Sequence, residues 1–330
     1  MKKIFLFLFL LLLVTGCGKF NEKNIINNLS KKVKNLDSYH LTGTLEIYRN
    51  EEKYTYSVES SYKKDDLYKV DLINKNNNHE QIILKNEEGI FVITPTLNKS
   101  FKFQSDWPYN NSQIYLLQPI INDLNNDSKS SCEKTSSGYI LKSKVNYSSE
   151  KDFNSQKIYL DKNKNIVKIE VLDNLENVKM SLNIIDIDYK AKFDNDYFNE
   201  EKYSKSLKEK NNNKEKESSS VEDIVYPMYV PIDTTLSGQD VVKTDVGERV
   251  ILTFSGESPF TVVQENISDD DVINFVYGDP YLILDTVGSI TDYSVSWISN
   301  GIEYSVLSDT LDVDELLEVA QSINVKAVAK

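Results

Sequence analysis

Residues 41–48, LTGTLEIY, alternate apolar and polar side chains with a period of two. Leu41, Leu45 and Ile47 fall on one face of an extended chain, whereas the threonines and the glutamate between them fall on the other. This alternation is typical of a β-strand that buries one face. Residues 54–60, YTYSVES, repeat the pattern. We therefore predict that this region forms a sheet with one apolar face.

The strand pattern continues downstream as far as residue 188. Further strands are expected at residues 67–73, 80–85, 89–94, 100–103, 138–145, 155–161, 165–172 and 179–188, with KN and NN turn signals between several of them. The result is a long antiparallel meander. Its apolar face must be buried, and helices, an acyl chain or a protein partner can each cover it.

Two helices are available to cover that face. The first is predicted from an apolar stripe at helical spacing that ends near Asp37. Its members are Ile25, Ile26, Leu29, Val33 and Leu36. The second helix pattern spans residues 112–124 and contains Pro119, which is expected to end or kink the helix.

The N-terminus combines Lys2 and Lys3 with an apolar run, residues 4–14, as a signal peptide does. A spanning helix needs about 20 apolar residues, so this run is too short to cross a membrane. Val14-Thr15-Gly16-Cys17 resembles the lipobox of bacterial lipoproteins. We predict that residues 1–16 are removed and that Cys17 carries fatty acyl chains such as palmitate. The alternative is an ordinary secretory signal with a chance cysteine.

Few residues of this chain can support metal, thiol or histidine chemistry. Cys132 is the only cysteine besides Cys17, so no intramolecular disulfide is expected once Cys17 is lipidated. Its polar surroundings favour an unpaired surface thiol over an intermolecular bridge. His40 and His79 are the only histidines and lie far apart in sequence. We therefore expect no metal site, no cofactor and no His-based catalysis.

The acidic charge lies in one part of the chain. Residues 223–330 hold 19 Asp and Glu against four Lys and Arg, a balance of −15, whereas the whole chain carries −13. This balance disfavours nucleic acid as a partner, and no compensating basic stripe occurs upstream. A cationic partner surface, or simply solubility, fits the charge better.

A polar segment separates the two parts. Residues 207–220, LKEKNNNKEKESSS, contain a single apolar residue and cannot bury enough surface to offset the entropy of ordering. We predict a flexible linker at 200–222. It follows a domain at 17–199 and precedes a smaller α+β domain at 223–330.

The end of the chain is predicted to be a hairpin followed by a helix. Asn300-Gly301 is a two-residue turn signal between alternating strands, which places Trp297 and Tyr304 near each other across the pair. Asp312, with Glu315 three residues later, is expected to cap the final helix. The apolar stripe of that helix is Val313, Leu316, Leu317, Ala320 and Ile323.

Three motifs that suggest chemistry have simpler structural explanations. Residues 269–271, three aspartates, lack the spacing of a cation loop and fit the first turn of a helix. Residues 256–260, GESPF, begin like a nucleophile elbow but end in phenylalanine instead of glycine, so Ser258 is expected to be structural. The tyrosines and Trp107 are candidates for stacking on sugar rings, although packing is the more common role of strand aromatics.

The N-terminal part resembles the lipoprotein-carrier superfamily, which includes LolA, LolB and the RseB/MucB regulators. The resemblance spans residues 22–198 and rests on the early helix that runs into LDSY at 36–39, on LTGTL at 41–45, and on the meander with a helical insertion. It implies a curved antiparallel sheet, a half-barrel, covered by helices. No residue matches a known lipid-contact position, so the ligand-binding residues stay unknown.

Residues 248–266, 281–290 and 293–309 resemble a module at the end of sporulation and germination lipoproteins of spore-forming Gram-positive bacteria, of the YdcC and GerS type. The resemblance implies a non-enzymatic protein, anchored by lipid on the extracytoplasmic face of the cell membrane. Some relatives support a cell-wall amidase, which implies an extracytoplasmic protein partner. The alternative is a carrier or sensor that binds acyl chains or lipoprotein segments. A cell-wall hydrolase is the weakest hypothesis, because no pair of acids is singled out by spacing.

Overall fold

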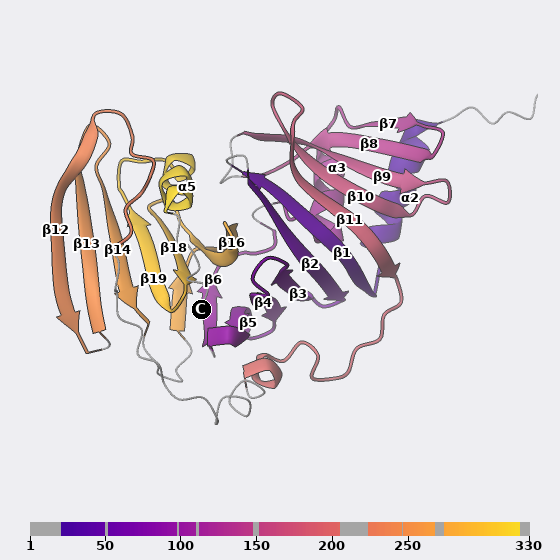
Figure 1. Cartoon of the computed structure of the whole chain (residues 1–330). Coiled ribbons are helices and arrows are strands. Elements are labelled where there is room, and N and C mark those ends of the chain that lie inside the picture. The colour runs from indigo at the N-terminus through magenta and orange to yellow at the C-terminus, as the bar shows by residue number, and fades with distance from the viewer. Residues whose placement is uncertain are drawn as a thin grey trace, which may run out of the picture.

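Two β-sheets lie side by side and hold most of the regular structure (Figure 1). The computed structural model describes residues 21–49, 52–97, 99–109, 112–147, 152–204, 224–245, 247–267 and 274–323. The structure has large antiparallel sheets and few helices, in keeping with the predicted class, whereas the helix-covered half-barrel stays a prediction.

The larger sheet has 12 strands in the order β15-β6-β5-β4-β3-β2-β1-β11-β10-β9-β8-β7. The pairing of β1 with β11 joins two meanders into one sheet. Of these strands, β7 and β15 were not expected from the sequence, and β15 is a strand where a helix was predicted to follow the three aspartates at 269–271. The strands are β1 (Ser38–Arg49), β2 (Glu52–Lys63), β3 (Leu67–Asn74), β4 (Glu80–Asn86), β5 (Gly89–Thr94), β6 (Lys99–Gln104), β7 (Ser131–Lys134), β8 (Gly138–Lys144), β9 (Phe153–Asp161), β10 (Ile166–Asp173), β11 (Val178–Asp188) and β15 (Asn274–Tyr277).

Strand β1 lies near the middle of this sheet, and its alternating burial confirms the predicted pattern. Leu41 and Leu45 are fully buried and Ile47 is 2% exposed. The register against β11 shifts at Gly43. A Cβ at that position would lie 2.8 Å from the carbonyl oxygen of Asn183, so a side chain here would collide with the neighbouring backbone. Glycine therefore permits the irregular pairing at this point.

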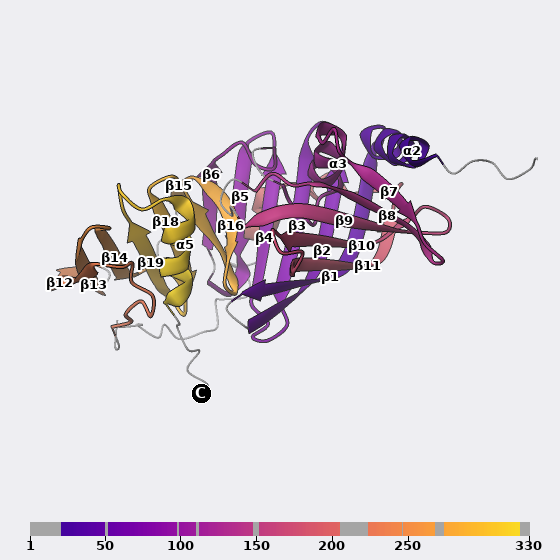
Figure 2. The ribbon, with the colours of Figure 1, turned by 90° about the horizontal axis from the view of Figure 1, so that it is seen from above.

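Helices α2 (Glu22–Lys34) and α3 (Leu117–Asn126) lie on the same face of the large sheet (Figure 2). They pack against each other, and they contact β7 and β8 respectively. Asn21 caps α2 by accepting a hydrogen bond from the Asn24 amide at 3.2 Å. The rest of the core on this face includes Trp107, Leu116 and other buried side chains between β6 and α3.

Helix α3 corrects one prediction, because Pro119 neither ends nor kinks it. Pro119 is the third residue of the helix, where a backbone N–H has no carbonyl partner within the helix. The missing donor therefore costs nothing at this position. The helix instead begins later than the apolar pattern suggested, at Leu117.

On the opposite face of the large sheet, the segment that follows β11 covers β4 and β5. Phe198 is buried against Ile82, Leu84 and their neighbours on β4 and β5, and Phe193 and Tyr197 pack beside it. Residues 200–204 are helical, and Glu200 is buried. Both faces of strands β4 and β5 are therefore covered, which explains their continuous burial.

The smaller sheet has seven strands in the order β12-β13-β14-β19-β18-β17-β16, and helix α5 (Val313–Ser322) packs on one face. The predicted hairpin is confirmed, since Asn300 and Gly301 have φ of 51° and 79°. Trp297 and Tyr304 pair across it with ring centroids 5.4 Å apart. The strands are β12 (Thr234–Thr244), β13 (Gly247–Gly256), β14 (Phe260–Asn266), β16 (Asp279–Ile283), β17 (Thr286–Ile290), β18 (Ser294–Ser299) and β19 (Ile302–Leu307).

The capping box of α5 is also confirmed. The Glu315 amide donates to Asp312 Oδ1, and the Asp312 amide donates to Glu315 Oε2, both at 3.1 Å. We expect Asp312→Ala to lower the free energy of unfolding by about 1 kcal/mol, because the first turn loses an acceptor for its free N–H groups. Urea titration measures the change. The control is Asp309→Ala, an exposed aspartate outside the helix, for which a shift of the same size would contradict the capping role.

Candidate functional site

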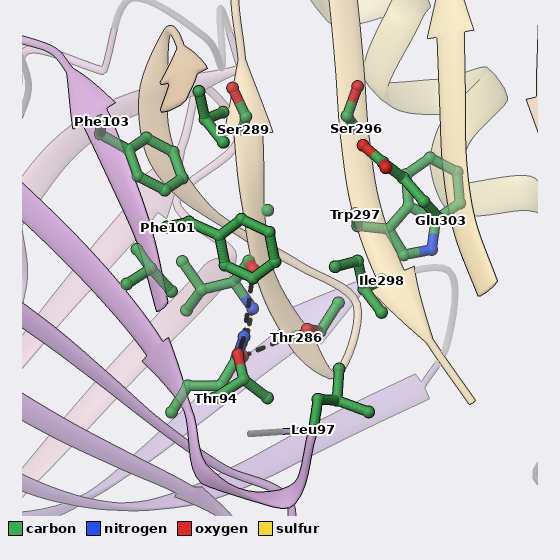
Figure 3. A pocket seen from close by; sticks show the side chains of 15 residues that line it. Thr94, Leu97, Phe101, Phe103, Thr286, Ser289, Ser296, Trp297, Ile298 and Glu303 are labelled. Atoms are coloured by element: carbon green, nitrogen blue, oxygen red, sulfur yellow. Dashed lines mark hydrogen bonds between the residues drawn. The ribbon is translucent and has the colours of Figure 1, made fainter. Parts of the chain in front are cut away.

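A cleft opens where the two sheets meet (Figure 3). One wall is formed by β5 and β6 and carries Phe101 and Phe103, and the other is formed by β17, β18 and β19. Ile298, Ser296 and Glu303 line the second wall. The cleft encloses about 450 Å³ of empty space, part of it open solvent. Its lining is mainly apolar with a few polar groups, which is the usual composition of a binding site.

Gln81 forms the polar floor of this cleft. The side chain is 4% exposed and reaches from β4 to the first residues of β17. Its Nε2 donates to the Val287 carbonyl at 3.2 Å, and its Oε1 accepts from the Val287 amide and from the Thr286 hydroxyl. One side chain thus satisfies both backbone groups of Val287, as a neighbouring strand would.

Further polar contacts join the two sheets. Tyr56 donates to the Leu284 carbonyl at 2.7 Å, and Arg49 donates to the Tyr281 hydroxyl at 3.0 Å. The strand β15, which follows β14 in the chain, pairs in parallel with β6 and forms the edge of the large sheet. The cleft therefore lies between two walls that are held together at several points.

Glu303 is the charged group in the cleft. It lies across from Glu265 on β14, and Arg249 on β13 makes a two-pronged ion pair with Glu265 at 2.8 Å. Burial raises the pKa of Glu303, the charge of Glu265 raises it further, and Arg249 opposes the shift.

Strand β12 is the outer edge of the small sheet (Figure 1). Most of its side chains are exposed, including Leu236, Val241 and Val242, which are 44%, 51% and 46% exposed. An edge strand presents unpaired backbone donors and acceptors on its outer side. Exposed apolar side chains next to such an edge are characteristic of a surface that another chain covers.

Two of the sites considered from the sequence lie outside the described residues. These are Cys17, the predicted lipidation site, and the aspartates at 269–271. Ser258 is placed as expected, in the turn between β13 and β14. Its amide donates to the Thr234 hydroxyl at 3.2 Å and its carbonyl accepts from the same hydroxyl at 3.3 Å. Ser258 therefore fixes a turn.

The expected surface position of Cys132 is wrong, because the side chain is 3% exposed. In the short strand β7, Cys132 faces the core beneath α2, while its neighbours Ser131 and Glu133 face solvent. Burial, together with the charge of Glu22, raises the pKa of the Cys132 thiol to about 11. A thiol held in its neutral form is a poor nucleophile. Because the residues around Cys132 are polar, nothing in the sequence indicated that Cys132 alone faces inward.

The structure places His40 beside a serine and a glutamate, a grouping that the sequence analysis did not foresee. His40 Nδ1 lies 2.9 Å from Ser61 Oγ, and its Nε2 lies 3.9 Å from a Glu59 oxygen. The order of groups is that of a hydrolase triad. Ser61, however, has 0% exposure, and its hydroxyl also lies 3.0 Å from the Tyr197 hydroxyl. No substrate carbonyl can reach this serine, so the group is structural.

Of two further residues singled out from the sequence, Trp107 is buried and His79 is partly buried. Trp107 has 0% exposure and cannot stack on a ligand, so its candidacy as a sugar platform is corrected. His79 lies in the turn before β4, where burial lowers its pKa and the charge of Asp285 partly opposes the shift. The described ranges contain no group of three or more His, Cys, Asp or Glu arranged to hold a metal ion. They also contain no helix long and apolar enough to cross a membrane.

These features define a two-sheet protein with an apolar inter-sheet cleft. The chain belongs to the family of the sporulation protein YdcC of Bacillus subtilis strain 168, to which it is 32% identical over 315 residues, covering 94% of this chain and 93% of that protein. Residues 1–17 match the prokaryotic membrane lipoprotein lipid attachment site. The resemblance to sporulation lipoproteins is thus confirmed.

Similar solved structures are more distant. The complex of MucA and MucB from Pseudomonas aeruginosa matches at 14% identity and a TM-score of 0.33, covering 92% of this chain and 99% of that chain. The complex of the CwlD amidase from Clostridioides difficile with the GerS lipoprotein matches at 18% identity and a TM-score of 0.31. This match covers 54% of this chain and 98% of that chain. A LolA superfamily protein from Nitrosomonas europaea matches at 10% identity and a TM-score of 0.32. This match covers 56% of this chain and 99% of that chain. With TM-scores this low, these likenesses carry no functional argument.

Proposed function

We propose that this chain is a lipid-anchored, non-enzymatic protein on the extracytoplasmic face of the cell membrane that binds a partner protein during sporulation or germination. The single observation that carries the proposal is the exposed edge of β12, which lies in the part of the chain with a charge balance of −15. A cell-wall amidase is the kind of partner that the family resemblance suggests.

In this proposal, residues 1–16 are the signal peptide and Cys17 carries the lipid. Residues 17–199 form the carrier-like domain, with its large sheet as the half-barrel. Residues 200–222 link it to the acidic module at 223–330. Asn21, which caps α2, is only four residues from Cys17, a distance of at most about 14 Å along an extended chain. The end of the molecule that contains α2 is therefore held close to the bilayer.

The partner is expected to add a strand to β12. Such an addition satisfies the free backbone groups of the edge, and the exposed valines supply apolar contact. The acidic module favours a partner segment that carries lysine or arginine. Because this attraction acts between exposed charges, association is expected to weaken as the salt concentration rises.

The alternative function, a carrier of acyl chains, is less well supported by the geometry. The apolar face that would hold a chain is already covered by α2, α3 and the residues between β6 and α3. Leu116, Leu117 and Trp107 all have 0% exposure in that layer. An acyl chain would have to displace close-packed side chains, which costs more than filling a free cavity.

The test uses a photo-crosslinking residue in place of Leu236, an exposed side chain on β12, in sporulating cells. We expect a covalent product with one extracytoplasmic protein, and we expect Val241→Glu to reduce its yield at least about tenfold, since a buried charge opposes strand addition. The matched control is Val167→Glu, because Val167 is a similarly exposed valine on β10 of the other sheet. A missing product, or equal losses from both variants, would contradict the proposal.

A further inference from the structure

A second depression, separate from the inter-sheet cleft, runs along helix α3. It consists of two adjacent hollows with about 640 and 730 Å³ of empty space, open solvent included. The hollows share Asn122, Asp123 and Asn146. Neither the family resemblance nor the proposed function uses this surface. We call it the carboxamide groove, after Gln118, Asn122, Asn126 and Asn146, which line it.

The spacing of three of these residues explains how the groove is built. Gln118, Asn122 and Asn126 stand four residues apart on α3, so they follow one stripe of the helix. The opposite side of the helix packs into the core. The buried residues are Leu117, Pro119, Ile120, Ile121 and Leu124. Asparagine is a weaker helix former than the lysine, glutamate or alanine that usually occupies an exposed helix face, so helix stability does not explain this stripe.

The floor of the groove is held in place by hydrogen bonds. Ser112 donates its hydroxyl hydrogen to Asp123 Oδ2. The Asn146 amide donates to Ser112 Oγ at 2.8 Å, and the Ser112 amide donates to the Asn146 carbonyl at 2.7 Å. Asp123 is partly buried, and burial raises its pKa to about 6, although the hydrogen bonds from Ser112 and Asn146 oppose the shift. The walls on both sides of Asp123 are thereby fixed relative to each other.

The charges of the groove are balanced. Asp123 and Asp127 are matched by Lys129 and Lys144. Asp127 accepts hydrogen bonds from the backbone amides of both lysines at 2.9 Å, which keeps the acid and the two bases close together. A polyanion would find no excess of positive charge here, and a cation would find no excess of negative charge. The balance favours an uncharged polar ligand.

Two further observations concern ligand contact. Tyr109 lines the hollow of about 640 Å³ and is 58% exposed, in contrast to the buried Trp107 two residues earlier. Gln118 also lines this hollow, and its buried Nε2 donor has no hydrogen-bond partner in the structure as described. The groove therefore offers an aromatic ring and several groups that both donate and accept, whereas the Gln118 Nε2 atom lies buried beneath its surface.

The geometry points to an uncharged oligosaccharide, bearing hydroxyl and acetamido groups, as the ligand of the carboxamide groove. A sugar hydroxyl both donates and accepts, and so does a carboxamide, whereas a carboxylate only accepts and an ammonium only donates. Lys85 Nζ lies 4.5 Å from the centroid of the Tyr109 ring, so the remaining exposed part of this ring provides the apolar surface for the C–H face of one sugar ring. This inference adds a site to the proposed partner-binding role and does not depend on the identity of the partner.

The test is calorimetric titration of the full chain in detergent with the tetramer of β-1,4-linked N-acetylglucosamine. We expect saturable binding, and we expect the double variant Asn122→Ala, Asn126→Ala to weaken it at least about tenfold through the loss of two hydrogen-bonding groups. Alanine strengthens a helix, so unfolding of α3 cannot account for a loss. The control is Asn163→Ala, an exposed asparagine in the turn between β9 and β10.

Two outcomes would overturn the inference. One is the absence of saturable binding up to about 10 mM sugar, a concentration at which even weak specific sites fill. The other is equal affinity of the wild-type chain and the double variant. Two further experiments distinguish the possible sources of the sugar. One is sedimentation with purified cell-wall glycan, and the other is flotation with vesicles that contain an uncharged glycolipid. Binding in the first experiment alone assigns the groove to the wall, and binding in the second alone assigns it to a lipid headgroup.

Discussion

Replacing Gln81 by leucine is expected to lower the free energy of unfolding by about 2–4 kcal/mol and to loosen the junction of the two sheets. Leucine has a similar volume but leaves the amide and the carbonyl of Val287 without the partner that Gln81 supplies. Each buried, unpaired backbone group costs about 1–3 kcal/mol. Thr286, which is 3% exposed, loses a hydrogen-bond acceptor as well.

Urea denaturation measures the stability change, and small-angle scattering measures the separation of the sheets. The matched control is Gln239→Leu, because Gln239 lies on β12, and its hydrogen bond with Tyr226 is exposed. A surface change of this kind is expected to alter stability by less than about 0.5 kcal/mol. If Gln81→Leu unfolds at the same urea concentration as the wild-type chain, Gln81 does not hold the sheets together.

The elements that were predictable from the sequence are those specified by short-range patterns. The alternation of Leu41, Leu45 and Ile47, the Asn300-Gly301 turn and the capping box of Asp312 each depend on residues within one strand, one turn or one helical turn. Side-chain period, φ preference and cap geometry are local properties, so the sequence contains enough information to predict them.

The junction of the sheets was not predictable, because it depends on contacts between distant parts of the chain. Gln81 and Val287 are 206 residues apart, and β15 pairs with a strand that precedes it by about 170 residues. A polar residue in a strand does not indicate which distant backbone groups its side chain will bind by hydrogen bonds. Cys132 shows the same limit, since the polar residues around it gave no indication that α2 would cover it.

The carboxamide groove was missed for a different reason, since its signal is local. Gln118, Asn122 and Asn126 are spaced at four residues, the same spacing that identifies an apolar helix stripe. The apolar stripe identifies the buried side of the helix, whereas the groove depends on the polar stripe opposite it. Asp123 and Asn146, by contrast, meet only because α3 packs beside β8.

Replacing Cys17 by serine is expected to abolish palmitate labelling of the chain and to release it from the membrane fraction. Each buried methylene of an acyl chain contributes about 0.8 kcal/mol, so two chains hold a protein firmly, whereas the remaining apolar run at 4–14 is too short to span the bilayer. Labelling with a palmitate analogue and membrane fractionation after a high-salt wash measure the two effects.

Cys132→Ser is the matched control, because it removes the only other cysteine of the chain. Cys132 is buried in β7, and burial keeps its thiol protonated, so acylation at that position is not expected. The control variant should therefore keep both the label and the membrane location. An ordinary secretory signal predicts a different pattern, in which neither variant nor the wild-type chain takes up label and all three are processed alike. That pattern would remove the anchor from the proposed function, while the β12 edge and the carboxamide groove would still be testable on the released protein.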